Sequence, residues 1–447
     1  MPDSDPSTSI DQRRDSSSAV TRREALTGLA TAALSAGALI AAAPLGAAEP
    51  VRRSNRGGWV EEPPNAADLP PNVPPWMQTQ GRPLSPYGEP SHYERDVVRL
   101  PTDLTATDLA SWNFTPLQHL HGIITPNGLH FERLHAGVPD IDPSQHRLMI
   151  EGMVKHPIIL TMDEILRYPA VSRVHFIECS GNTLTEWRKP SGKTVQFTHG
   201  LLSCAEWTGV PLATVLEAAG IDPKATWALA EGADAAAMAR SIPVEKLLDD
   251  ALLAYAQNGE MLRPSQGYPL RLLLPGYEGN MNIKWLRRLK FGTAPFQTYE
   301  ETAYYTELMR NGKARQFNFL MEAKSVITFP SAGQRLSKPG YYQISGLAWS
   351  GAGRVKQVDV STDGGSSWHT AQLQSPIMSR CLTRFQFNWA WDGKPVLLQS
   401  RCVDETGYAQ PTLTQLVAER GYNSVYHMNA IQSWQVAADG EVANVHA

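Results

Sequence analysis

Residues 174–182 read VHFIECSGN, and this stretch decides how the chain is interpreted. Its apolar and β-branched residues predict a short strand that ends at Cys179, and a Ser-Gly-Asn turn follows at once. A thiol at a strand end, beside a tight turn, lies where proteins commonly present functional groups. Its soft thiolate could bind a metal or act as a nucleophile. A buried structural cysteine is the alternative, because free cysteine is among the most buried residue types.

Strand and helix patterns alternate on both sides of this stretch. Residues 270–274 read LRLLL and predict a second buried strand, whereas Pro211–Ala219 has a helical pattern that Gly220 ends. Strands that alternate with short helices are typical of a mixed sheet covered by helices. We therefore expect an α+β fold whose first folded domain, a mixed α/β domain, covers residues 95–322.

A different pattern begins at about Ala323. β-Prone runs are separated by turn signals, such as the DGG sequence at 363–365, and few helical patterns occur. This pattern predicts a small β-sandwich over residues 323–447. Cys381 and Cys402 both lie in this part and could pair in an oxidising compartment, but the sequence leaves open whether they meet.

The composition limits the classes of function. The chain has 447 residues, four cysteines and a formal net charge of −4. This length suggests two folded domains with extra segments at the ends. The small net charge gives no sign of a nucleic-acid surface, so an anion site must be a local basic pocket. The sequence has no Cys-x-x-Cys pair, which excludes thioredoxin-type chemistry, zinc ribbons and covalent haem attachment in this chain.

The N-terminal segments resemble an export signal followed by an extended arm. Arg22 and Arg23 precede an Ala/Leu/Gly run that small residues end, so we interpret 1–48 as a twin-arginine signal peptide for export to the periplasm. A membrane anchor is the alternative, although the Ala-rich run is only marginally long enough to span. Residues 49–94 are rich in proline, glycine and arginine, and we expect an extended arm there that could wrap a partner subunit.

Basic residues mark a candidate anion site. In FERLH at 131–135, the planar donors of Arg133 suit an oxyanion, and His135 could donate to a phosphate. A zinc site is the alternative for the histidines crowded nearby, His119, His121, His130 and His135. Their spacing matches no familiar zinc-ligand pattern.

A second basic segment covers residues 266–288. Lys284 and Trp285 follow a Gly-rich turn there, and together they could hold a phosphate and a flat ring system. A solvated basic edge is the alternative interpretation of this segment.

Taken in order, these motifs resemble the sulfite oxidase family of molybdopterin enzymes over about residues 95–415. The order is Phe-x-Arg-x-His, then Glu-Cys-Ser-Gly-Asn, then Gly-x-x-Leu-Arg with Ile-Lys-Trp-Leu-Arg-Arg, then Val-Asp-Val-Ser-Thr-Asp-Gly-Gly. The combination is specific, although no single piece would suffice. The resemblance implies a molybdopterin-binding domain followed by an immunoglobulin-like sandwich used for dimerisation, with a molybdenum–molybdopterin cofactor and no haem in this chain.

The resemblance also assigns roles to residues. Cys179 would ligate the molybdenum, and Arg133 would face the substrate oxyanion. The pterin and its phosphate would be held by Phe131, His135, Asp234, Gln266, Arg271, Asn282, Ile283 and Lys284. The match at Asp234 is loose, and Gln266 stands where sulfite oxidases often have histidine. Leu184 stands where they commonly carry a second pocket arginine. Three residues are candidates for the family's active-site tyrosine, namely Tyr299, Tyr304 and Tyr305.

Within that family the chain most resembles the SoxC-type molybdenum subunits of bacterial sulfane dehydrogenases, because of ECSGNTLTEW at 178–187 and the long N-terminal arm. This implies oxidation of carrier-protein-bound sulfane sulfur in thiosulfate oxidation, with electrons passing to a c-type cytochrome subunit of the SoxD type. Without the second arginine the pocket suits sulfur presented on a carrier protein better than it suits free sulfite. A dehydrogenase acting on free sulfite and a non-enzymatic periplasmic binding or adhesion protein are the alternatives.

Overall fold

The computed structural model describes residues 52–53, 59–60, 73–77, 80–102 and 107–446. The chain divides into two units, Met1–Glu89 and Pro90–Ala447. The expected signal peptide lies outside the described residues. The described part of the first unit holds two paired two-residue strands, β1 (Arg52–Arg53) and β2 (Trp59–Val60), and the 3-10 helix η2 (Pro75–Met77). No described helix in either unit has the length and apolar character needed to cross a membrane.

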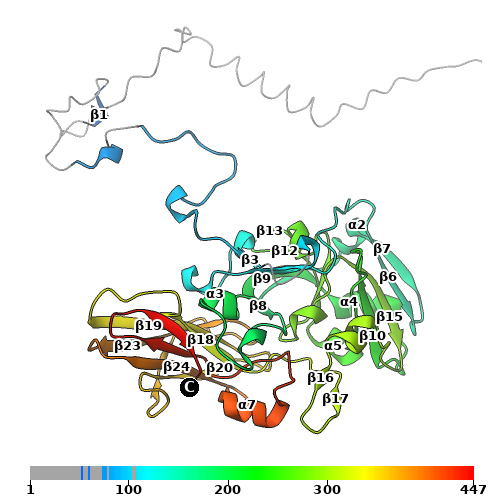
Figure 1. The fold of residues 1–447 in the computed structure, drawn as a ribbon. Coiled ribbons are helices and arrows are strands. Elements are labelled where there is room, and N and C mark those ends of the chain that lie inside the picture. The colour runs from blue at the N-terminus through cyan, green and yellow to red at the C-terminus, as the bar shows by residue number, and fades with distance from the viewer. Residues whose placement is uncertain (1–51, 54–58, 61–72, 78–79, 103–106, 447) are drawn as a thin grey trace, which may run out of the picture. The chain divides into compact units, whose positions relative to one another are not determined.

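A mixed sheet and an antiparallel sheet, with short helices, form the first part of the second unit (Figure 1). One sheet has the order β11 (Ala239–Pro243), β10 (Trp227–Gly232), β15 (Leu286–Gly292), β6 (Arg147–Gly152) and β7 (Ile158–Thr161). The other has the order β13 (Glu260–Met261), β12 (Leu252–Gln257), β9 (Leu202–Pro211) and β8 (Val171–Glu178), with β14 (Arg271–Leu273) also paired to β12. A smaller sheet joins β3 (Leu100–Pro101), β4 (Trp112–Phe114) and β5 (Glu132–Arg133). The helices here are α2 (Met162–Ile165), α3 (Val195–His199), α4 (Leu212–Ala219), α5 (Val244–Asp249) and α6 (Tyr299–Ala303).

The local predictions for this part are confirmed. The stretch at 174–182 forms the end of β8 and a turn, and the run at 270–274 contains β14. The predicted helix is α4, and it ends where Gly220 adopts a φ of +63°. This left-handed conformation is accessible to glycine without a Cβ clash, so the chain can leave the helix there.

A two-sheet sandwich follows, coloured yellow to red in Figure 1. Its first sheet has the order β18 (Lys324–Phe329), β19 (Gly340–Trp349), β23 (Thr383–Trp391) and β22 (Gln372–Leu373). Its second has the order β21 (His369–Thr370), β20 (Val355–Ser361), β24 (Val396–Asp404), β25 (Ser433–Val436) and β26 (Val442–Val445). The helix α7 (Leu413–Arg420) connects β24 to β25. The expected α+β fold with a C-terminal sandwich is confirmed, including the turn at 363–365 between β20 and β21.

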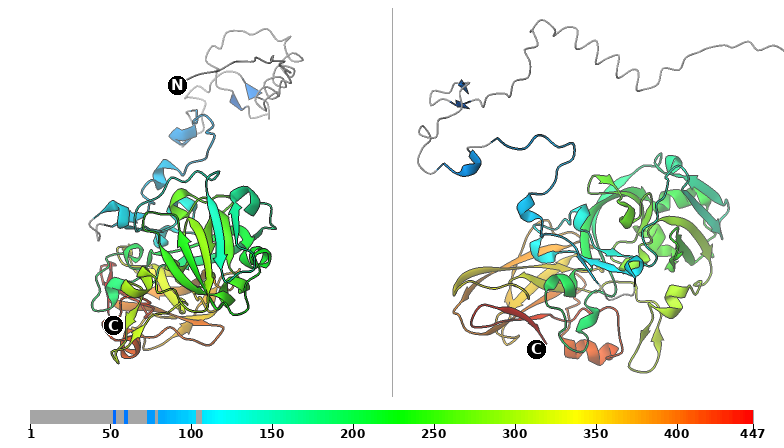
Figure 2. Two further views of the ribbon diagram at one scale, coloured as in Figure 1. Left: turned by 90° about the vertical axis from the view of Figure 1, so that its right-hand side faces the viewer. Right: turned by 45° about the horizontal axis from the view of Figure 1, so that its top comes forward.

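The sandwich and the mixed domain share a packed boundary, and they lie side by side in the further views (Figure 2). Phe176 of β8 and Cys204 of β9 belong to the same buried apolar cluster as the sandwich strands. The backbones of Gly276 and Gly351 meet there, and a Cβ on Gly276 would lie 2.3 Å from the carbonyl oxygen of Gly351. Only residues without side chains permit so close an approach.

The four cysteines are all free and buried. Cys402 does not pair with Cys381, which was one of the two outcomes that the sequence left open. Instead the Sγ atom of Cys381 lies 3.5 Å from that of Cys204 in the mixed domain. The neighbour of Cys381 is therefore set by the packing of two domains against each other.

Candidate molybdenum and pterin site

The turn after β8 is held by the side chain of Asn182. Its amide nitrogen donates to Glu178 Oε1 at 2.9 Å, and its amide oxygen accepts from the backbone N–H of Leu201 at 3.1 Å. The backbone N–H of Cys179 donates to the carbonyl oxygen of Leu201 at 3.0 Å. A Cβ on Gly181 would lie 3.2 Å from Leu184 Cδ2, which is a tight contact, so a side chain at this position would crowd the turn. The sequence thus folds into a rigid turn that presents one sulfur atom.

The side chain of Cys179 lines a cavity in the mixed domain. All ten site residues that the sequence predicts line it: Phe131, Arg133, His135, Cys179, Asp234, Gln266, Arg271, Asn282, Ile283 and Lys284. They come from β5, the ends of β8 and β10, β14 and the loops on either side of it. The structure therefore brings the three separate sequence segments to one place, while the role of each residue remains a prediction.

Positive charge predominates in the lining of the cavity, where Asp234 supplies a single carboxylate. Arg133, Arg271 and Lys284 line it, and none of them forms an ion pair with a carboxylate within the described ranges. Burial, and next the nearby Arg271, lowers the pKa of Lys284 to about 7, and burial lowers the pKa of Arg271 to about 9. Buried cations that lack an ion-pair partner are unfavourable in a low dielectric, even where they donate to backbone carbonyls. A bound anion such as a phosphate would supply the missing partner.

Two buried polar atoms at the cavity lack a hydrogen-bond partner in the described structure, His130 Nε2 and Arg271 Nε. Such orphans are rare in folded proteins and commonly mark a place where a ligand or water completes the bonding. Burial lowers the pKa of both His130 and His135 to about 3, so each ring is neutral and can donate one proton and accept another. Trp285 adds a flat face to the wall. These donors and surfaces fit an anionic, heteroaromatic cofactor.

Gln266 and Asn282, two of the predicted cofactor residues, are hydrogen-bonded to the backbone around the cavity. The amide nitrogen of Gln266 donates to the carbonyl oxygen of Phe131 at 2.9 Å. The amide oxygen of Asn282 accepts from the backbone N–H of Leu274 at 2.7 Å, and its nitrogen donates to the carbonyl oxygen of Glu278 at 3.1 Å. Both side chains therefore fix the loops that form the cavity wall.

The protonation state of the Cys179 thiol depends on whether a positive charge lies beside it. Burial raises the pKa of its thiol to about 11, so an isolated thiolate is unfavourable there. A bound metal cation would reverse this preference, because a coordinating thiol is deprotonated outright. The zinc alternative finds no support, since no group of three or more metal-ligating His, Cys, Asp or Glu side chains occurs in the part of the chain that the structure describes.

Packing distinguishes the three tyrosine candidates. Tyr305 is 8% exposed and lines the cavity, whereas Tyr299 and Tyr304 are 65% and 48% exposed. Sequence reasoning missed His130 as a wall residue, and it also missed Ile177, Met238, Gly279 and Asn280. No motif signals these positions; they reach the wall only through the fold.

Leu184 does not lie in the wall of the Cys179 cavity, where the resemblance places a second pocket arginine. It lines a smaller neighbouring cavity with apolar walls and is absent from the lining of the Cys179 cavity. Trp112 lines the same small cavity, and the guanidinium carbon of Arg133 lies 4.6 Å from the centre of a Trp112 ring. Arg133 thus lines the Cys179 cavity and is held by stacking on Trp112, while its role toward the substrate stays a prediction.

Comparison with known proteins agrees with this geometry. Residues 135–300 match a family model described as an oxidoreductase molybdopterin binding domain, and residues 315–434 match one described as a Mo-co oxidoreductase dimerisation domain. The chain is 32% identical over 331 residues to mitochondrial sulfite oxidase of Mus musculus, covering 69% of this chain and 59% of that protein. It is 33% identical over 311 residues to nitrate reductase (NADH) 1 of Oryza sativa subsp. japonica, covering 62% of this chain and 34% of that protein. The chain thus spans less than two thirds of the length of these curated relatives.

A solved structure covers more of the chain. The crystal structure of the sulfane dehydrogenase SoxCD from Paracoccus pantotrophus superimposes with a TM-score of 0.83 and 46% sequence identity, covering 84% of this chain and 98% of that one. Together with the two domain matches, it identifies a molybdenum oxidoreductase and excludes a non-enzymatic binding or adhesion protein. The chain therefore belongs to the sulfite oxidase family of molybdopterin oxidoreductases, with a molybdenum–molybdopterin cofactor and an SoxC-like fold.

Proposed function

We propose that this chain oxidises sulfane sulfur held on a carrier protein during thiosulfate oxidation. The supporting observation is its similarity, at 46% identity over 98% of the solved chain, to a protein described as a sulfane dehydrogenase. In each step one oxygen atom from water joins the sulfur, and two electrons and two protons leave. The molybdenum cofactor supplies this two-electron oxygen-transfer chemistry when bound.

The protein's own residues orient the reactants. Cys179 would hold the metal, and the basic residues Arg271 and Lys284, which line the same cavity, would hold the anionic end of the pterin. Arg133 would orient the terminal oxygens or thiolate of the substrate, while most binding energy would come from the carrier's surface outside the cavity. A single cation is sufficient for that task.

The proposal extends to the assembly. Electrons would pass to a c-type cytochrome partner, because the sequence has no Cys-x-x-Cys-His motif for covalent haem. The twin-arginine pattern at Arg22 and Arg23 supports export to the periplasm. The arm at 49–94 would contribute to the partner surface, and the sandwich over 323–447 would support self-association, in keeping with the dimerisation-domain match.

Free sulfite is the second candidate substrate, because sulfite oxidases are also similar to this chain. The test compares kcat/KM for free sulfite and for a carrier-bound sulfane, with cytochrome c as the acceptor. We expect the carrier-bound substrate to be preferred at least tenfold. A low KM for free sulfite together with no turnover of the carrier-bound substrate would replace the proposal with the sulfite dehydrogenase alternative. Co-purification with a haem-staining subunit tests the electron acceptor separately.

A further inference from the structure

The sandwich domain reaches the Cys179 turn through the carboxylate of Glu178. This side chain is fully buried, and its Oε1 accepts from the Nζ of Lys324 at 3.1 Å while its Oε2 accepts from the Nε1 of Trp349 at 2.6 Å. Lys324 is the first residue of β18 and Trp349 the last of β19. The Nζ of Lys324 also donates to Thr183 Oγ1 at 2.8 Å. One buried cation of the sandwich thus holds the residues on both sides of the turn.

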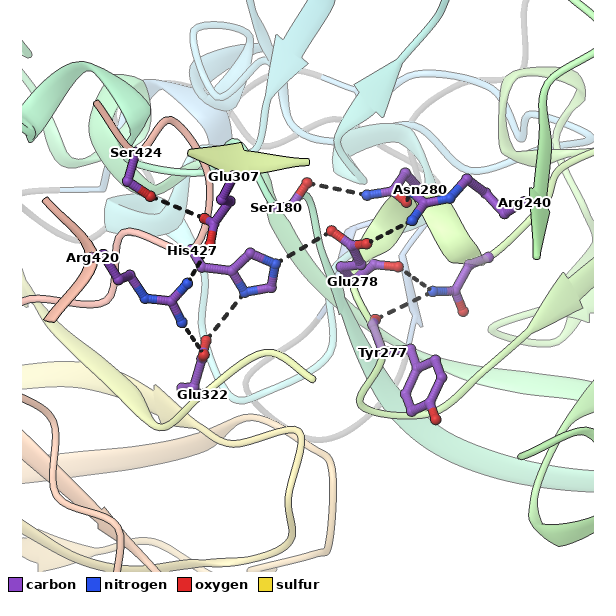
Figure 3. Close-up of polar contacts among 11 residues, drawn as sticks. Ser180, Arg240, Tyr277, Glu278, Asn280, Glu307, Glu322, Arg420, Ser424 and His427 are labelled. Carbon is purple, nitrogen blue, oxygen red and sulfur yellow. Dashed lines mark hydrogen bonds and ion pairs between the residues drawn. The ribbon is translucent and has the colours of Figure 1, made fainter. Parts of the chain in front are cut away.

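A second contact comes from the segment between α7 and β25. The backbone N–H of His427 donates to the carbonyl oxygen of Ser180 at 2.9 Å. Its ring lies between two carboxylates, with Nε2 3.3 Å from Glu278 and Nδ1 3.1 Å from Glu322, as Figure 3 shows. The two carboxylates, Glu322 first, raise the pKa of His427 to about 10 against the effect of burial, so the imidazolium is retained at neutral pH.

Glu278 links the ring of His427 to the same turn. It immediately precedes Gly279, and a Cβ there would lie 2.9 Å from the carbonyl oxygen of Glu178. Its carboxylate also pairs with Arg240, which contacts Asn280, and the amide nitrogen of Asn280 donates to Ser180 Oγ at 3.1 Å (Figure 3). Both chain neighbours of Cys179 are therefore connected to a cation of the sandwich. Glu178 is paired directly with Lys324. Ser180 is connected to His427 through its backbone carbonyl and through this network.

A contribution to stability alone does not explain why these charged and strained groups are buried beside the turn. Burying the Lys324–Glu178 pair removes two charges from water, and such pairs are often no more stabilising than apolar residues of the same size. His427 has a φ of +56°, an uncommon conformation for a residue with a side chain. Strained and buried polar groups that gather beside a reactive residue commonly serve to hold its geometry.

We propose that Lys324 and His427 of the sandwich are positioning residues for the metal ligand, so that the C-terminal domain sets the orientation of the Cys179 sulfur toward molybdenum. The inference rests on Cys179 as the ligand and is independent of which sulfur substrate the enzyme oxidises. Neither residue contacts the sulfur itself. Both act through Glu178 and Ser180, the neighbours of Cys179 in the chain.

The test uses the purified full chain, with and without cofactor, and four variants, one of which, Lys324→Arg, keeps the cation. Lys324→Met removes the buried cation, His427→Gln removes the imidazolium, and Trp349→Phe removes one hydrogen-bond donor while it keeps the aromatic packing. Lys246→Met is the matched control, because Lys246 is also a buried lysine in an ion pair, 2.7 Å from Asp250, and does not contact the turn. The readouts are the electron paramagnetic resonance signal of the molybdenum after one-electron chemical reduction and the rate at which iodoacetamide modifies Cys179 in the cofactor-free protein.

We expect Lys324→Met and His427→Gln to change the g-values of the molybdenum signal and to raise the alkylation rate of Cys179 at least tenfold. Lys324→Arg should restore both readouts toward wild type, and the control should leave both within twofold, even if it lowers the melting temperature equally. If a charge-removing variant does not fold, the test relies on Trp349→Phe. A changed molybdenum signal in that variant supports the proposal. Wild-type signals and alkylation rates in every folded variant would overturn it. No step of this test needs a substrate, so it remains informative if the proposed sulfane oxidation is wrong.

Discussion

Lys284 offers a test of the anion site in which two measurements change in opposite directions. Its ammonium donates to the carbonyl oxygens of Arg133 and Ser265, at 3.1 and 3.0 Å, and it forms no ion pair among the described residues. Its pKa is lowered to about 7 from the ordinary value of 10.5, first by burial. Since each pKa unit corresponds to about 1.4 kcal/mol, the buried charge costs the cofactor-free protein roughly 4 kcal/mol at pH 7.

The pH dependence follows from the sign of this shift. Because the folded-state pKa is lower than the unfolded one, the unfolded chain binds more protons between pH 7 and 10.5. The cost is therefore fully present below pH 7 and disappears as the pH rises to 10.5. Over this window, Lys284 makes the cofactor-free protein more stable at higher pH.

Lys284→Met should remove this cost while it leaves two carbonyl oxygens without their donor, at about 1 kcal/mol each. The net gain of about 2 kcal/mol should raise the melting temperature of the cofactor-free protein by a few degrees. Cofactor binding should weaken, because losing a charge-assisted hydrogen bond to a phosphate costs about 1.5–3 kcal/mol, or roughly ten- to a hundredfold in affinity.

The assay is thermal unfolding of the cofactor-free chain at pH 6 and pH 9, together with molybdenum per chain after purification. Lys246→Met is the control, because it also removes a buried lysine, one that is paired with Asp250 and does not line the cavity, so that molybdenum content should stay at the wild-type level. The reasoning is refuted if Lys284→Met lowers the melting temperature of the cofactor-free chain and retains wild-type molybdenum content.

Three further predictions follow from the site and the signal. Cys179→Ser should give a folded protein that has lost almost all turnover, because an alkoxide is a harder donor than a thiolate; turnover within tenfold of wild type would contradict the ligand assignment. Tyr305→Phe should lower kcat at least tenfold while Tyr304→Phe leaves it within twofold, since only Tyr305 lines the cavity, and equal effects in steady-state assays would count against this distinction. Arg22→Lys with Arg23→Lys should leave the precursor in the cytoplasm, as cell fractionation would detect, and normal periplasmic accumulation would show that the signal was misread.

Short-range chemistry explains why much of the site could be predicted. Cys179 lies in a strand-turn motif whose residues are neighbours in the chain, and Asn182 holds that turn by a hydrogen bond to Glu178, four positions away. Lys284 and Trp285 likewise lie in one local segment. Backbone propensities and turn chemistry act over a few residues, so the strand at 174–179 and the helix end at Gly220 could be predicted without the fold.

Contacts between distant segments could not be predicted in this way. Tyr299, Tyr304 and Tyr305 lie within seven positions of one another, and only packing after α6 buries Tyr305 at the cavity. Leu184 is close to Cys179 in sequence, but the chain turns it into a separate apolar cavity. One-dimensional spacing does not say to which side of a short turn a side chain points.

The sequence by itself therefore determined the strand-turn that presents Cys179, the α+β domain order and the family resemblance. Only the tertiary structure decided that Cys381 meets Cys204 instead of Cys402, and that Lys324 pairs with Glu178 across 146 positions of the chain. The physical reason is that ion pairs and thiol contacts of this kind depend on how two packed domains meet. Their boundary is set by the burial of many side chains at once, and no local pattern in the sequence records it.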